Sequence, residues 1–152
     1  MATSDVEGRQ EVLDALGEAT DALAQALASL GAAYEQLDDQ HADRLEEQLF
    51  RPVQGAYGRA RRTHAEFAAR HGLPGREFEA PSPGLPSTGV KGFIENAVGA
   101  VTRAETELVA LQDSLMPIEF GDPELRAGLG QVSDLIAGLS PRARDFVRTF
   151  GR

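Results

Sequence analysis

The chain contains no cysteine in its 152 residues. It therefore cannot form a disulfide, a thiolate metal site or a cysteine nucleophile. It has no apolar run long enough to cross a bilayer, and the polar residues after Met1 do not form a basic and apolar leader. Glycine-rich loops of the Walker and dinucleotide-binding types are also missing. These absences predict a cytoplasmic protein that has no common nucleotide-binding motif.

Charge is strongly segregated along the sequence. The net charge of −9 argues against general nucleic-acid binding, so we expect no nucleic-acid partner. Acids and bases number twelve and two in residues 1–50, one and six in 51–76, ten and three in 77–139, and one and four in 140–152. Two short basic stretches thus lie within an otherwise acidic chain.

Leucine recurs with heptad spacing in a composition rich in alanine, leucine, glutamate, glutamine and arginine, which favours helices. Spacings that alternate between three and four place such residues on one stripe that must pack against other helices. A first stripe begins at Leu13, and a second follows one heptad frame from Val90 to Leu139. The predicted seam residues are Leu13, Leu16, Leu23, Leu27, Leu30, Leu37, Leu108, Leu111 and Leu115.

Helix boundaries follow from capping and breaking signals. The first helix is expected to start near Ser4 and to run without interruption, because residues 37–49 contain neither glycine nor proline. The alternative is that the chain folds back around residues 38–41. Pro52 predicts a kink or short break, and Asp122 should cap a helix whose first residue is Pro123. The predicted helices are about 4–50, 52–71, 89–116, 123–139 and 141–150.

Residues 72–88 hold four of the eight prolines and are expected to form a loop across one end of the bundle. The sequence thus predicts one all-α domain over residues 1–152, an elongated antiparallel bundle or coiled coil of proline-kinked helices. A two-helix hairpin buries little surface, so we expect a homodimer to complete the core.

No constellation of residues points to catalysis or to a cofactor. His64 and His71 lie two helical turns apart, roughly 10 Å along the axis, which is too far to chelate one ion. The sequence has no Glu-x-x-His pair, and Asp38-x-x-His41 is the nearest approach to one. No carboxylate pair or serine–histidine pair stands out as an acid–base or nucleophilic site. We therefore predict a non-enzyme without cofactor or metal.

Arginines mark the two basic stretches. Arg51, Arg59, Arg62 and Arg70 are spaced eight, three and eight apart, so they share one side of a helix. These residues either pair with the acidic first helix, within the chain or across a dimer, or contact an anionic surface such as phospholipid head groups. The second set marks the C-terminal helix and comprises Arg142, Arg144, Arg148 and Arg152.

A long acidic and leucine-rich segment leads into a basic one through Leu49, Phe50, Arg51, Pro52, Val53 and Gln54. Over residues 13–70 this order resembles BAR domains. In that family a long helix of this kind passes through a Phe-Ile-x-Pro-Leu-Gln type sequence into a basic segment. The resemblance implies an elongated antiparallel dimer of kinked helices that binds and bends membranes.

Three functions follow as hypotheses. The first is a non-catalytic, self-associating helical scaffold that binds anionic membrane surfaces in a BAR-like manner, which would place it peripherally at a membrane. The second is a protein adaptor that docks through the apolar face of its last helix, formed by Phe146, Val147 and Phe150. The third is a helical bundle that binds a metal or a ligand.

Overall fold

The computed structural model describes residues 2–150 and shows an all-helical bundle, as the sequence predicts. No strand occurs within this described range. The elements are α1 (Ala2–Glu35), α2 (Asp39–Leu45), the π-helical turn η1 (Glu46–Phe50), α3 (Arg51–Arg70), the 3₁₀ turn η2 (Pro86–Thr88), α4 (Gly89–Asp113), α5 (Met116–Glu119), α6 (Pro123–Ile136) and α7 (Leu139–Phe150).

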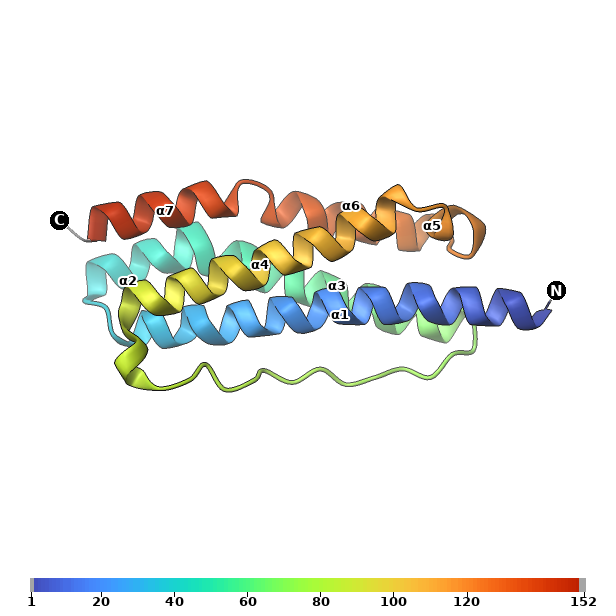
Figure 1. The fold of residues 1–152 in the computed structure, drawn as a ribbon, viewed down its shortest axis with the longest axis horizontal. Coiled ribbons are helices and arrows are strands. Elements are labelled where there is room, and N and C mark those ends of the chain that lie inside the picture. The colour runs from blue at the N-terminus through green and yellow to red at the C-terminus, as the bar shows by residue number, and fades with distance from the viewer. Residues whose placement is uncertain (1, 151–152) are drawn as a thin grey trace.

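The helices run along one long axis and form four rows (Figure 1). The first row is α1, which at about 1.5 Å per residue is about 50 Å long, and α2, η1 and α3 return beside it as the second row. The third row is α4, antiparallel to α1, and α6 and α7 together make the fourth. One chain thus supplies a four-row bundle with a single long crossover.

The first predicted helix does not run without interruption to residue 50, because the chain reverses direction at residues 36–38. Asp38 adopts an extended backbone, and its carboxylate accepts a 3.0 Å hydrogen bond from the His41 backbone N–H. The ring Nδ1 of His41 lies 2.7 Å from the same carboxylate. The hydrogen bond from the His41 backbone is the larger cause that lowers the pKa of Asp38, and the hydrogen bond with the His41 ring is the next. A helix cap, rather than a glycine or proline, therefore starts the second row.

Pro52 produces no break. The helix continues from α2 through η1 into α3, and the residues just before the proline form a π-helical turn in which the Arg51 N–H donates to the Glu46 carbonyl. Pro52 itself lies in the first turn of α3. The wider turn accommodates a residue that lacks an N–H donor and whose ring crowds the preceding turn.

The long loop runs lengthwise rather than across one end of the bundle (Figure 1). It leaves α3 at one end and enters α4 at the other, because α3 and α4 point in the same direction. We call residues 72–85 the strap. Its Arg76 forms a 2.7 Å ion pair with Asp21 of α1, and its Phe78 contacts the ring of His64 in α3. The strap therefore covers the groove between these two helices.

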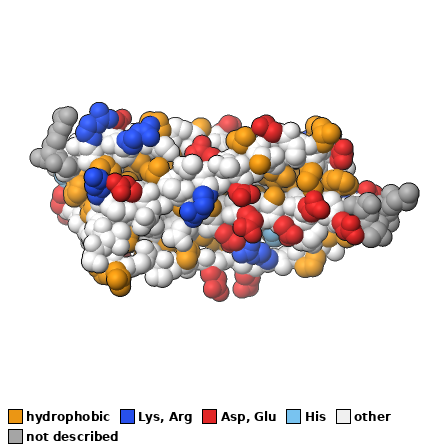
Figure 2. All heavy atoms as spheres, in the orientation of Figure 1, with side chains coloured by type: hydrophobic (Ala, Val, Ile, Leu, Met, Phe, Trp, Pro, Cys, Tyr) orange, Lys and Arg blue, Asp and Glu red, His pale blue; other side chains and the backbone are white. Residues whose placement is uncertain are grey.

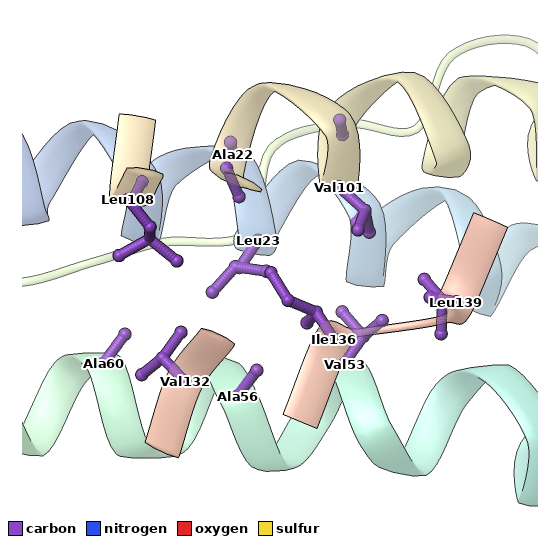
Figure 3. Close-up of a cluster of buried hydrophobic side chains, with 14 of the residues drawn as sticks. Ala22, Leu23, Val53, Ala56, Ala60, Val101, Leu108, Val132, Ile136 and Leu139 are labelled. Atoms are coloured by element: carbon purple, nitrogen blue, oxygen red, sulfur yellow. The ribbon is translucent and has the colours of Figure 1, made fainter. Parts of the chain in front are cut away.

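The core is built by all four rows of the one chain (Figure 3). Figure 3 shows Leu23 of α1, Val53 of α3, Val101 of α4 and Ile136 of α6 meeting at its centre. The buried seam residues are Leu13, Leu16, Leu23, Leu30, Leu108 and Leu111, while Leu27 and Leu37 are half-buried against the same core. The seams therefore find their packing partners within the chain, and core closure does not require a second copy.

The prediction that Leu115 belongs to the buried seam is wrong, because its side chain is 66% exposed. The reason is that α4 ends at Asp113, after which Ser114 adopts an extended backbone and its hydroxyl donates to the Leu111 carbonyl. Ile118, the next position of the heptad frame, is 69% exposed. The frame resumes only with Leu125 in α6.

Other helix ends differ slightly from prediction. α1 begins at Ala2 rather than near residue 4, and α6 ends at Ile136 because Gly138 adopts a left-handed φ of +75°. α7 begins at Leu139, two residues before its predicted start. The Asp122 cap is confirmed, because its carboxylate accepts a 2.7 Å hydrogen bond from the Leu125 N–H.

Two substitutions in the heptad frame test this packing. Leu108→Asp places a carboxylate where the side chain is 1% exposed, and an unpaired buried charge should cost about 4 kcal/mol or more. Leu115→Asp should change the free energy of unfolding by less than about 0.5 kcal/mol, because the site is exposed. Urea unfolding of both variants checks this. Equal destabilisation by the two would contradict the end of α4 at Asp113 and would mean that residue 115 is buried with the rest of the heptad pattern.

Candidate functional site

The outer face of α3 carries exposed arginines. Arg51, Arg61 and Arg62 are exposed, while Arg59 is half-buried and its Nε has no hydrogen-bond partner. None of the four forms an ion pair or side-chain hydrogen bond with any residue of the described range 2–150. The predicted pairing with acids of α1 inside the chain is therefore not made by these residues.

Two of these arginines border a hollow between α3 and the strap. It has a volume of about 390 Å³ and is lined by Gly58, Arg61, Arg62, Ala65, Arg76, Glu77 and Phe78. We call it the arginine hollow. The Arg61 guanidinium lies over the ring of Tyr57, with its carbon 5.3 Å from the ring centre. Arg62 lies over Gly58, where a Cβ would be in ordinary van der Waals contact with its Nη1 at 3.7 Å.

The strap brings the third arginine into position. The Arg76 guanidinium lies 4.2 Å from the centre of the Phe78 ring, in cation–π geometry, and donates to Asp21. Gly17 makes room for it, since a Cβ there would stand 3.0 Å from Arg76 Nη1. Phe78 in turn meets the His64 ring edge to face at 5.1 Å. One side of the arginine hollow therefore depends on a strap residue that α1 holds in place.

His64 lies beneath this part of the strap. It is 3% exposed, and its Nδ1 has no hydrogen-bond partner. Burial is the main cause that lowers the pKa of His64, and the positive charge of Arg76 lowers it further, against the opposing effect of Asp14 and Asp21. The neutral imidazole is therefore the form that the folded chain favours.

Arg70 differs from the other candidate contacts, because it is paired within the chain. Its Nε and Nη2 donate to the two carboxylate oxygens of Asp122, each at 2.8 Å, and His71 Nε2 lies 2.9 Å from the same group. Burial raises the pKa of Asp122, but these hydrogen bonds and that from Leu125 N–H outweigh it and lower the pKa to about 2. Asp122 thus joins the end of α3 to the start of α6.

The arginines of the last helix form a separate group. Arg142, Arg144 and Arg148 are exposed, and Arg148 pairs with Asp145 one turn away. Arg144 and Arg148 line a hollow of about 350 Å³ against Ile94 and Val98 of α4. Arg152 lies outside the described residues. Arg144 and Arg148 therefore line a different hollow from Arg61 and Arg62.

Phe146, on the apolar face proposed for partner docking, is 1% exposed. Val147 and Phe150 are partly buried and pack against the same core, and α7 packs against α4 and η1. The chain's own bundle therefore occupies the face that the adaptor hypothesis assigns to a partner.

Acidic side chains line the exposed face of α1. Glu7, Glu11, Asp14 and Glu18 are exposed, and Asp21 continues the same stripe with spacings of four and three. Figure 2 shows acidic side chains gathered on the right-hand half of the visible face, where Figure 1 places the N-terminal half of α1. Helices α1 and α3 therefore present opposite charges, with the strap between them.

Neither a metal cluster nor a membrane-spanning helix is found in residues 2–150. No group of three His, Cys, Asp or Glu side chains in this range could hold a metal ion. Within the same range, none of the helices has the length and hydropathy needed to span a bilayer. No family model, curated protein or solved structure matches the chain.

Sequence reasoning found Arg62 of the arginine hollow but missed Arg61 and Arg76. Helical spacing selected one row of arginines and passed over Arg61, which is adjacent to Arg62 in the chain. Arg76 lies in the strap, so only the lengthwise path of the strap brings it to α3. The available signal was the cluster of arginines at 59, 61 and 62, with further arginines at 70 and 76.

The buried imidazole predicts a loss of stability in mild acid. A lowered pKa means that the unfolded chain binds the proton more readily than the folded chain once the pH falls below about 6.5. The free energy of unfolding should therefore be highest above that pH. It should then fall by at most about 1.4 kcal/mol per pH unit until folded His64 also titrates.

Urea unfolding of wild type and His64→Gln between pH 7.5 and 5 measures this effect. As the pH falls, the free energy of unfolding of wild type should fall relative to that of His64→Gln. The other two histidines, His41 and His71, contact Asp38 and Asp122 and are left unchanged in both proteins. The same pH dependence in His64→Gln as in wild type would contradict the assignment.

Proposed function

We propose that this protein is a non-catalytic helical scaffold that binds anionic surfaces, such as phospholipid head groups, through the outer face of α3. The observation that carries the proposal is that Arg51, Arg61 and Arg62 are exposed there without an acidic partner in the described chain. Guanidinium groups pair with phosphate through two parallel hydrogen bonds, which suits them to this surface.

The charge distribution sets the strength and orientation of such binding. Arginines near an anionic membrane contribute about 1 kcal/mol each, and this attraction fades beyond a Debye length of about 10 Å. The net charge of −9 opposes contact in any orientation that turns the α1 acids to the surface. The protein should therefore bind weakly, with α3 toward the lipid, and should dissociate as salt rises.

A second copy of the chain is the competing occupant of the α3 face. Two copies related by a two-fold axis could place the acidic stripe of α1 against the arginines of α3, twice over. The predicted homodimer would then be held by these ion pairs, because the hydrophobic core is already closed within one chain. Light scattering at low and high salt distinguishes a second copy from a membrane surface, because a charge-paired dimer should dissociate as salt rises even without vesicles.

The fold of this chain differs in one respect from the fold that the BAR resemblance implies. The resemblance implies one kinked helix across residues 13–70, whereas the chain reverses at 36–38 and forms a hairpin from that region. The proposal therefore depends on the arginines of α3 and does not extend to membrane bending.

Co-sedimentation with vesicles tests the proposal. Wild type should pellet with vesicles that contain phosphatidylglycerol, not with neutral phosphatidylcholine vesicles, and less at physiological than at low salt. Arg51→Glu with Arg62→Glu should weaken binding by at least about 30-fold, which corresponds to the loss of two contacts of about 1 kcal/mol.

Arg142→Glu with Arg144→Glu is the matched control, because it makes the same change in net charge on α7. This variant should retain most of the binding. No binding of wild type at low salt, or an equal loss in the two variants, would refute a contact specific to α3.

A further inference from the structure

The arginine hollow concentrates positive charge at one place. Three guanidinium groups line it, from Arg61, Arg62 and Arg76, and Glu77 is the single carboxylate among its lining residues. Like charges gathered in this way repel one another, unless an anion joins them. The lining residues therefore carry a net charge of +2, which Asp21, the partner of Arg76, lowers to +1.

The three guanidinium groups reach the hollow from two sides. Arg61 and Arg62 follow one another on α3, and neither forms a hydrogen bond or ion pair within residues 2–150, so their donors are free to bind a ligand. Arg76 stands on the strap, steadied by Asp21 at 2.7 Å and by the ring of Phe78. A ligand between α3 and the strap would meet donors from both.

The remaining walls indicate the shape of the ligand. Gly58 has no side chain where Arg62 crosses it, while Ala65 and Phe78 supply apolar surface. A volume of about 390 Å³ exceeds that of a single tetrahedral anion and falls within the range of small-molecule sites. The lining thus suits an anionic group attached to a small organic body.

We propose that the arginine hollow binds a phosphate group carried by an ester. A phosphate ester offers several oxygens to three planar donor groups, and arginine pairs with phosphate in a bidentate manner. Its negative charge offsets the excess of positive charge in the lining. The phosphate can come from a lipid head group or from a soluble ester, and the lipid source rests on the function proposed above.

Calorimetric titration of the full chain with glycerol 3-phosphate at low salt tests the site directly, with glycerol as the uncharged control. We expect saturable binding of glycerol 3-phosphate and none of glycerol. Arg61→Gln with Arg62→Gln should weaken binding by at least about tenfold, the effect of about 1.4 kcal/mol. Arg142→Gln with Arg144→Gln, which removes the same charge from α7, should bind as wild type does.

A second arm distinguishes the two sources of phosphate. Excess glycerol 3-phosphate should displace wild type from phosphatidylglycerol vesicles if both occupy the hollow, whereas equimolar sodium chloride should displace it less. Binding of the soluble ester without binding to vesicles supports the site and overturns the membrane function. Vesicle binding without binding of the soluble ester supports the membrane function and overturns the site.

The glutamine variants should remain folded, since the substituted side chains are exposed, and their unfolding curves check this. Equal affinity of wild type and Arg61→Gln with Arg62→Gln for glycerol 3-phosphate would also overturn the proposal. That result would place the anion elsewhere on the surface.

Discussion

The Asp38 cap reverses the chain, and the arrangement of the other helices depends on that reversal. Because the carboxylate of Asp38 satisfies the His41 N–H, α2 can begin at Asp39 with just three residues between it and the end of α1. The reversal lays α3 against α1, and the core is then completed by α4 and by α6 with α7. It also turns the arginines of α3 outward, beside the acidic face of α1 rather than at the far end of one long rod.

Close helix packing and the strap together produce the proposed site. Gly17 lets His64 and Arg76 fit beside α1, since a Cβ there would stand 3.0 Å from Arg76 Nη1 and 3.8 Å from His64 Nε2. The strap must span the bundle because α3 and α4 are parallel. Its path brings Arg76 to α3 and covers His64, so one connection supplies both a wall of the arginine hollow and a buried imidazole.

Local signals predicted much of the fold, whereas long-range contacts did not follow from the sequence. The spacing of Leu13 and Leu108 correctly indicated buried stripes, and Asp122 correctly indicated a helix start. The reversal was predicted only as the alternative to an uninterrupted helix, because neither glycine nor proline marks it, although an aspartate three residues before His41 is a capping signal. The arginine hollow could not be assembled in advance, since Arg61 and Arg76 meet only through the path of the strap.

Distance measurement between α1 and α3 tests the reversal most directly. The chain lacks cysteine, so Glu11→Cys and Glu66→Cys, both at exposed positions, allow two spin labels to be attached. Adjacent helices lie about 10 Å apart, so with label arms the distance should be below about 35 Å in samples diluted with unlabelled protein. A continuous helix at about 1.5 Å per residue would separate the labels by roughly 80 Å, and that result would contradict the account.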